Sequence, residues 1–311
     1  MQSHKSVAGG LVVLFPLFLM LFWGVCPTVA DDPISPTRSL ESLVKRGQIR
    51  NPSIVESSGL VRSRRWPNVF WTHNDSGDRA RIFAIRRDGT EVNNRATSNS
   101  GIQVFGAKNM DWEDIAVDSE GYLIIGDIGN NIFHRPKLTL YRVEEPDPFK
   151  DQSTARAEKI SIYFPDRPPP ALDSEALFWA KGSIYLLSKT RNGVNTGLYR
   201  VNETQPREAV PLIRIGSFDF QTPVTAADAS PDGRLLAVLT YKAVWIFQRP
   251  RGKDNYLLGK NSVFPVQAGQ CEAVCFDGDR LLIGNEAGDL FALDVGTLLA
   301  LPSKPIHFER E

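Results

Sequence analysis

After Gly47 the apolar residues occur in short runs, separated by polar turns rich in Gly, Pro, Asn and Asp. Some runs alternate apolar with polar side chains, as in LTLYRVE (138–144) and AVWIFQR (243–249). Such alternation is typical of β-strands with one buried face, and the turn clusters between the runs are typical of hairpins. No convincing amphipathic helix is visible after Gly47. The pattern therefore predicts an all-β chain.

The strand pattern repeats five times. Each repeat has an acidic or hydroxyl residue, an apolar run, a turn, a second apolar run, a polar cluster and two further strand-like runs. The matching residues, spaced by 57, 62, 50 and 47 residues, are Glu56, Glu113, Glu175, Thr225 and Glu272. Repeated four-stranded units are the signature of a β-propeller. We predict a single β-propeller domain over residues 48–309, with five blades of four antiparallel strands, the last strand being PIHFE (305–309).

The first thirty residues have a different character. A polar start is followed by a continuous apolar run over residues 11–25, and Thr28 and Ala30 are small residues of the kind that a signal peptidase favours. We interpret residues 1–30 as a signal peptide and residues 31–47 as an N-terminal linker. The mature protein is then secreted, or lies in the periplasm or cell envelope, without a membrane segment. An uncleaved anchor over residues 8–30 is the alternative.

Charge and cysteine content narrow the function classes. The chain has 36 basic and 36 acidic residues, and this balance argues against a nucleic-acid binder, which normally has a basic excess. After signal cleavage only Cys271 and Cys275 remain. Four residues along a strand separate them by roughly 13 Å, which is too far for a disulfide. We expect two buried, free thiols.

Several motifs carry a resemblance to a known family. They are THNDSGD, DWEDIA, GDIGNN, DSEALF, SPDGR and CEAV. With these motifs the chain resembles a family of exported bacterial β-propeller proteins, described as esterase-like or phytase-like and otherwise uncharacterised. The resemblance covers roughly residues 50–295, is most specific in the first two repeats, and implies a fold but no settled reaction. The family pattern GDIGDN reads GDIGNN here, so Asn130 replaces one charged ligand candidate.

The repeats place acidic residues together. In a propeller the first strand of each blade lines the central channel and the second returns antiparallel, so the start of one and the end of the other lie on one face. We therefore predict a ring of metal ligands, Glu56, Glu113, Glu175 and Glu272. Ca²⁺ is the expected cofactor, because hard cations take several oxygen ligands. The alternatives are Lys189 as a counter-charge, protonation of one Glu, and screening by water.

Polar residues at the strand ends surround this ring. The ligand-binding candidates are His73, Asn74, Asp75, Asp127, Asn131, Lys189, Tyr241, Asn285 and Glu286. Among them His73 is the best candidate acid or base, because histidine titrates near neutrality. In the turn DIGNN, we expect Gly129 to supply a positive φ angle.

These features favour a binding function. We predict a monomeric protein that binds a small-molecule or protein ligand at its acidic, Ca²⁺-occupied channel face. The alternative is a Ca²⁺-dependent hydrolase of phosphate esters, other esters or lactones, and a third possibility is an interaction module that uses the blade edges. The chain has no GxSxG elbow and no Walker loop, and it has few cations near the predicted face, so catalysis is left open.

Overall fold

The computed structural model divides the chain into two compact units, Met1–Ser35 and Pro36–Glu311. It describes residues 43–97, 99–165, 172–202 and 209–301, all within the second unit. The predicted signal peptide (1–30) and the predicted last strand (305–309) lie outside these residues. None of the described helices is long and apolar enough to cross a membrane.

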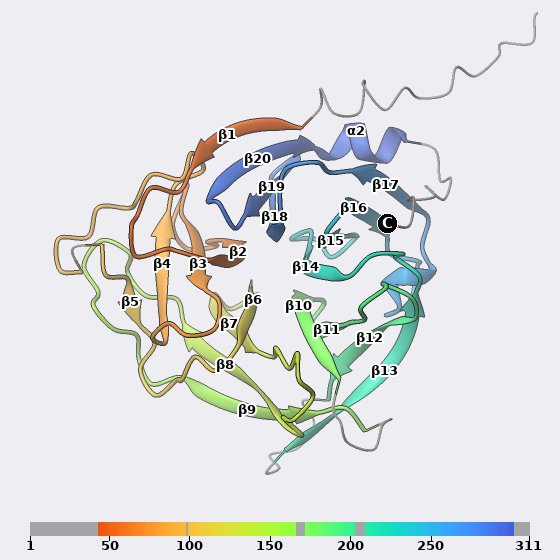
Figure 1. The fold of residues 1–311 in the computed structure, drawn as a ribbon, viewed down its shortest axis with the longest axis horizontal. Coiled ribbons are helices and arrows are strands. Elements are labelled where there is room, and N and C mark those ends of the chain that lie inside the picture. Colours follow the sequence, from red (N-terminus) through yellow and green to blue (C-terminus); the bar gives the residue numbers. More distant parts are fainter. Residues whose placement is uncertain (1–42, 98, 166–171, 203–208, 302–311) are drawn as a thin grey trace, which may run out of the picture. The chain divides into compact units, whose positions relative to one another are not determined.

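The described residues form an all-β fold, as the sequence predicts (Figure 1). The strands are β1 (Val44–Gln48), β2 (Ser57–Arg62), β3 (Phe70–Asn74), β4 (Arg81–Ile85), β5 (Ile102–Gln103), β6 (Trp112–Val117), β7 (Tyr122–Asp127), β8 (Leu138–Glu144), β9 (Glu158–Tyr163), β10 (Asp173–Ala180), β11 (Ser183–Lys189), β12 (Thr196–Val201), β13 (Val210–Phe218), β14 (Val224–Ala229), β15 (Leu235–Thr240), β16 (Ala243–Gln248), β17 (Asn261–Pro265), β18 (Cys271–Asp277), β19 (Arg280–Asn285) and β20 (Asp289–Asp294). A 3₁₀ turn, η1 (Tyr256–Leu258), and a short helix, α2 (Val295–Ala300), complete the fold.

Strands that are neighbours in sequence pair antiparallel within each sheet. Three sheets have four strands, in the orders β2-β3-β4-β5, β14-β15-β16-β17 and β1-β20-β19-β18. The fourth sheet has eight strands, in the order β10-β11-β12-β13-β9-β8-β7-β6. It contains two antiparallel runs that meet where β13 pairs parallel with β9, through Val210 with Ile162 and Pro211 with Tyr163.

The first strands of the repeats lie innermost in a propeller-like arrangement (Figure 1). β2, β6, β10, β14 and β18 contact one another in that order, and β18 contacts β2. Side chains join neighbouring inner strands: Ser58 Oγ donates to the Glu113 carbonyl at 2.6 Å, and Thr225 Oγ1 donates to the Cys271 carbonyl at 2.8 Å. The inner strands therefore form a bonded ring that holds their side chains in place.

The buried carboxylate of Asp114 connects three of these strands. Its oxygens accept hydrogen bonds from the backbone N–H of Ile115, Leu177 and Ala227, on β6, β10 and β14. Burial raises the pKa of Asp114 well above its usual range, and the backbone donors only partly oppose this. Apolar side chains fill the space between the sheets, as where Phe218 of β13 packs edge-on against Trp245 of β16.

The N-terminal boundary differs from the prediction. Residues 44–47, assigned to the linker 31–47, and Gln48 form β1, which pairs with β20 through Val44 with Ala292 and Gln48 with Asp289. The described fourth strand of the last sheet therefore comes from the start of the chain. The sequence pattern also missed α2, whose first turn is capped by the Asp294 side chain.

The cysteine prediction is confirmed. Cys271 and Cys275 both lie on β18, both are buried, and both are free. Their side chains belong to the packed interior rather than to a metal site or a disulfide.

Candidate functional site

Every innermost strand has a β-bulge at the same place. In each first hairpin the register shifts by one residue, and the extra residues are Gly59, Glu113, Glu175, Thr225 and Glu272. A bulge inserts an unpaired residue and re-aims its side chain, and bulges are frequent beside functional sites. The carboxylates of Glu113, Glu175 and Glu272 are thus presented together at one end of the inner strands.

The bulge corrects the sequence alignment of the first repeat. Glu56 was aligned with the other acidic residues and expected on an innermost strand, but it precedes β2, which begins at Ser57. The equivalent position is Gly59, with φ of 67°. A side chain there would be strained and would come within 2.8 Å of His73 Nε2. The first repeat therefore contributes no bulge carboxylate.

The three bulge carboxylates, Glu113, Glu175 and Glu272, line a cavity of about 180 Å³. Its lining comprises Glu56, Ser57, Ser58, Asp75, Glu113, Asn131, Glu175, Lys189, Tyr241, Gln270, Glu272 and Glu286. The predicted metal ligands Glu56, Glu113, Glu175 and Glu272 are all in that set. So are five of the predicted ligand-binding residues: Asp75, Asn131, Lys189, Tyr241 and Glu286. Most of the charged groups that line the cavity are therefore carboxylates, and Lys189 contributes the one ammonium group of this lining.

Some of the carboxylates have partners. Lys189, at the end of β11, forms an ion pair with Glu175, and its ammonium lies 5.6 Å from the centre of the Tyr241 ring. The Gln270 amide donates to Glu272 at 2.8 Å and to Glu286 at 2.6 Å. The counter-charge considered for Lys189 is thus present, and its ion pair is with Glu175.

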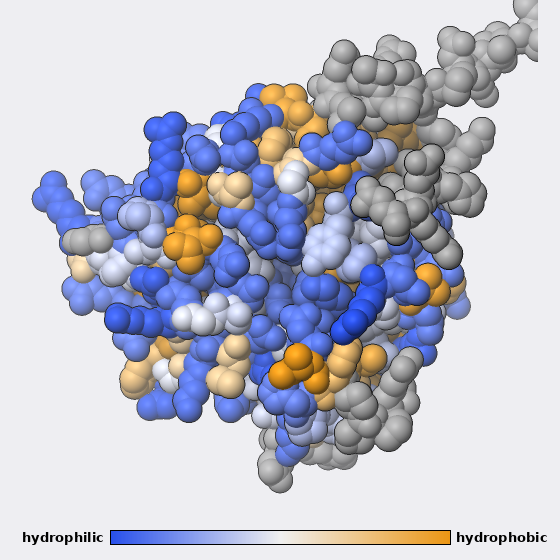
Figure 2. Space-filling view, in the orientation of Figure 1, coloured by the Kyte–Doolittle hydropathy of each residue, from blue (hydrophilic) through white to orange (hydrophobic). Residues whose placement is uncertain are grey.

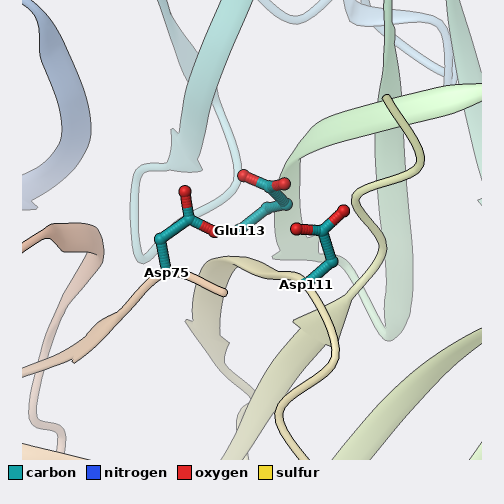
Figure 3. A group of neighbouring side chains, drawn as sticks. All are labelled: Asp75, Asp111 and Glu113. Carbon is teal, nitrogen blue, oxygen red and sulfur yellow. The ribbon is translucent and has the colours of Figure 1, made fainter. Parts of the chain in front are cut away.

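Three other carboxylates meet without such partners. Asp75 follows β3, Asp111 precedes β6 and Glu113 lies on β6, and their ligand atoms are all within 4.8 Å of one another. Their carboxylates point toward one another (Figure 3). Glu113 is only 5% exposed, and its carboxylate makes no hydrogen bond or ion pair with any other described residue. We call this group the carboxylate cluster.

The cluster carboxylates are hard to ionise together. Burial raises the pKa of Asp111 to about 6, and the Asp75 carboxylate adds to the effect. Burial also raises the pKa of Glu113 well above its usual range, with further contributions from Glu175 and Asp75. Burial raises the pKa of Asp75 as well. Without a cation to balance them, the cluster carboxylates therefore retain protons at a pH where free carboxylates have lost them.

The backbone around Asp111 fixes the cluster. The Asp111 carbonyl accepts hydrogen bonds from Ile128 and Gly129, both at 3.1 Å. Gly129 does not have the positive φ expected for it. It is required for space instead, because a Cβ there would lie 2.1 Å from Glu113 Oε1 and 2.4 Å from Asp111 Oδ2.

His73 does not line the cavity. It is fully buried, and its Nδ1 lies 2.9 Å from the Asn74 carbonyl. Burial lowers the pKa of His73 to about 4, so the ring is neutral near pH 7. This position gives no support to the acid or base role that we expected for it.

The remaining predicted ligand-binding residues hold the cavity wall in place. Asn74 accepts from the Val55 N–H, Asp127 pairs with Arg135 at 2.7 Å, and Asn285 donates to the Ala268 carbonyl. Asn130, the departure from the family motif, is buried and both donates to and accepts from the Arg135 backbone. An aspartate could not make that donor contact.

Sequence reasoning missed Asp111. It was read as part of the DWEDIA motif, and only Glu113 of that motif was assigned to the ring. The signal was present, since Asp111 and Glu113 lie two residues apart at the start of a strand. What the sequence could not show is that the backbone after β7 bonds Asp111 and that its carboxylate lies beside those of Asp75 and Glu113.

Comparisons with known proteins add little. No family model matches the sequence, and no curated protein matches it, so the resemblance to exported esterase-like or phytase-like propellers stays a prediction. Similar solved structures include virginiamycin B lyase from Staphylococcus aureus, at 14% identity over 76% of this chain and 66% of that chain, with a TM-score of 0.42. This chain thus spans slightly under two thirds of the lyase. A PQQ-bound aldose sugar dehydrogenase from Streptomyces coelicolor is 9% identical over 81% of this chain and 98% of that one, with a TM-score of 0.48. At these identities and scores, the activities of the two enzymes say nothing about this chain.

Proposed function

We propose that this protein is an exported five-bladed β-propeller that binds Ca²⁺ in the carboxylate cluster and uses the ion to hold a small-molecule or protein ligand. The observation that carries the proposal is the Glu113 carboxylate, which is buried and unpartnered while it faces Asp75 and Asp111.

The inner strands support five blades. Each of β2, β6, β10, β14 and β18 begins a hairpin with the same bulge. The eight-stranded sheet counts as two blades in this interpretation, because only two residue pairs join β9 to β13. Its halves, β6 to β9 and β10 to β13, each have four consecutive strands in sequence order, as do the sheets β2 to β5 and β14 to β17.

The cluster is compact enough for one Ca²⁺ ion to contact all three carboxylates. Ca²⁺ binds oxygen at about 2.4 Å, so two ligands on opposite sides of the ion lie about 4.8 Å apart. The ligand atoms of Asp75, Asp111 and Glu113 lie within that limit. A bound dication would also remove the electrostatic cost of three close carboxylates, because each would ionise against a positive charge.

The ion would retain positions for a ligand. Three carboxylates supply only part of the six to eight oxygens that Ca²⁺ takes. The cavity also contains polar side chains, among them Asn131 and Tyr241, that could orient a ligand with hydroxyl or carboxyl oxygens. On the face shown in Figure 2, the hydrophobic residues form separate patches among hydrophilic ones. This surface favours a polar ligand over a broad apolar contact.

Calorimetry and thermal unfolding of the purified protein test this function. Ca²⁺ should bind and raise the melting temperature, since a ligand at a hundredfold excess over Kd adds about 2.7 kcal/mol to stability. Glu113→Gln should weaken binding and shrink the rise, whereas Glu120→Gln, in the exposed turn between β6 and β7, should change neither. A wild-type protein whose melting temperature ignores Ca²⁺ and chelator would rule the function out.

Calcium-dependent hydrolysis is a second candidate, and Glu272 is the observation that favours it. Burial raises the pKa of this carboxylate to about 7, and it lines the same cavity as the cluster. A group with that pKa can accept a proton from water near neutral pH. Ester or phosphate-ester cleavage that needs Ca²⁺ and is lost in Glu272→Gln, with calcium affinity kept, would establish it.

A further inference from the structure

A second hollow lies beside the carboxylate cluster. It is a groove of about 610 Å³, and its lining includes Arg79, Gln103, Lys108, Asn109, Met110 and Gln152. Unlike the acidic cavity, this groove presents basic and amide side chains. It played no part in the sequence prediction.

The groove and the cluster share a wall. Asn109 lines the groove, and its side-chain amide donates to the Asp75 carbonyl at 2.7 Å. Met110 also lines the groove, and the next residue is Asp111 of the cluster. Consecutive Cα atoms are about 3.8 Å apart, so the Lys108 and Asp111 Cα atoms are separated by at most about 11 Å. A ligand of modest size can therefore reach both places.

Two cations of the groove are free to bind a ligand. Arg81 is already engaged, because its Nε and Nη2 each contact Asp78 at 2.8 Å. By contrast, the side chains of Arg79 and Lys108 are exposed and have no ion pair or hydrogen bond with any described residue. Exposed cations without partners suit a carboxylate or phosphate group.

Two amides of the groove have free side chains as well. Gln103 and Gln152 are exposed, and their hydrogen bond to each other uses only backbone atoms. A primary amide offers both donors and an acceptor, which matches the hydroxyl groups of a polyol or sugar. The groove thus combines binding groups for negative charge with binding groups for hydroxyls.

We propose that the groove binds a polyhydroxylated organic anion, such as an acidic saccharide. Its charged group pairs with Arg79 and Lys108, while other oxygens reach the ion at Asp75 and Asp111. This assignment rests on the proposed calcium site and gives the ligand of that site a chemical class. A carboxylate and a phosphate would use the same cations.

Calorimetry with defined probes tests the assignment. Trigalacturonate and glucose 6-phosphate represent the carboxylate and phosphate forms, and maltotriose is the neutral comparison. The calcium-loaded protein should bind one or both anions and not maltotriose. The double variant Arg79→Gln/Lys108→Gln should weaken anion binding by at least about tenfold, since charge-assisted hydrogen bonds are lost. The control Arg251→Gln/Lys253→Gln, in the exposed turn after β16, removes the same charge and should bind like the wild type.

The readouts separate the two proposals. Calcium titration of each variant reports on the cluster, and anion titration reports on the groove. A protein that binds calcium but neither anion, or a double variant that binds the anions like the wild type, overturns the groove assignment. If calcium does not bind, the proposed function fails. Anion titration in calcium-free buffer then tests the groove assignment by itself. Anion binding that is lost in the double variant supports the assignment, and an absence of anion binding to the wild type overturns it.

Discussion

Lys189 and Glu175 form an ion pair across the first hairpin of the third repeat, at the edge of the acidic cavity. The side chains are 16% and 5% exposed, so the pair is largely removed from bulk water. The Lys189 ammonium is thus committed to Glu175, and the carboxylate cluster is left for a dication.

Replacing the lysine should therefore separate stability from metal binding. Lys189→Met leaves Glu175 buried and unpaired, and we expect the calcium-free protein to lose about 3–5 kcal/mol of stability. Its affinity for Ca²⁺ should rise, because a positive charge near the cluster has gone. Adding Glu175→Gln should restore much of the stability. Chemical denaturation measures the change in stability and calcium titration measures the change in affinity. An unchanged calcium affinity would show that the Lys189 charge does not act on the carboxylate cluster.

Protons should compete with calcium. Burial raises the pKa of Asp111 to about 6 and that of Glu113 well above its usual range, and each must lose its proton to bind the ion. Acidification from pH 8 to pH 5.5 should therefore weaken binding, by roughly tenfold for each pH unit below the pKa of a single linked proton. Calorimetry in two buffers of different ionisation heat counts the protons released. A constant Kd over this range would exclude Asp111 as a ligand.

Gly129 should be sensitive to a single methyl group. In Gly129→Ala the new Cβ would overlap the carboxylates of Glu113 and Asp111, so we expect a loss of about 1–3 kcal/mol together with weaker calcium binding. Gly284→Ala is the matched control, since its Cβ meets nothing closer than 3.4 Å. Equal effects of the two substitutions on calcium affinity would refute this spatial role.

Asp228 should make stability depend on pH. It lies half-buried on β14 and accepts the Phe276 N–H, and burial raises its pKa to about 7. The folded protein thus keeps a proton that the unfolded chain releases above its lower pKa, so the stabilising contribution fades as pH rises toward and past 7.

Asp228→Asn should therefore flatten the stability profile between pH 5 and pH 8, with a relative gain on the order of 1–3 kcal/mol at the upper end. Asp232→Asn is the comparison, because hydrogen bonds with Ser230 and Arg234 outweigh burial and lower the Asp232 pKa to about 2, outside that window. Denaturant unfolding at each pH measures both. If the unfolding free energies of Asp228→Asn and wild type change with pH in the same way, the role given to Asp228 is wrong.

The sequence predicted what depends on local pattern. Alternating apolar residues such as those of 138–144 do form a strand, and the acidic residues Glu113, Glu175 and Glu272 do face one cavity. What it missed depends on register and on distant contacts. Glu56 was aligned three residues away from the bulge at Gly59, and the burial of His73 follows from packing against Trp112. Neither a bulge nor a tertiary contact has a signature in one short run.

The pairing of β1 with β20 has a consequence for how the chain is made. The two strands are about 250 residues apart in the chain. Ribosomes add about 5–20 residues per second, so β1 emerges some 12–50 seconds before its partner. During that time β1 lacks its partner strand and exposes an edge that other chains could join. We expect folding of this protein to end with a late, cooperative step in which β1 and β20 pair. Until then, we expect correct folding to depend on a factor that covers the exposed edge of β1.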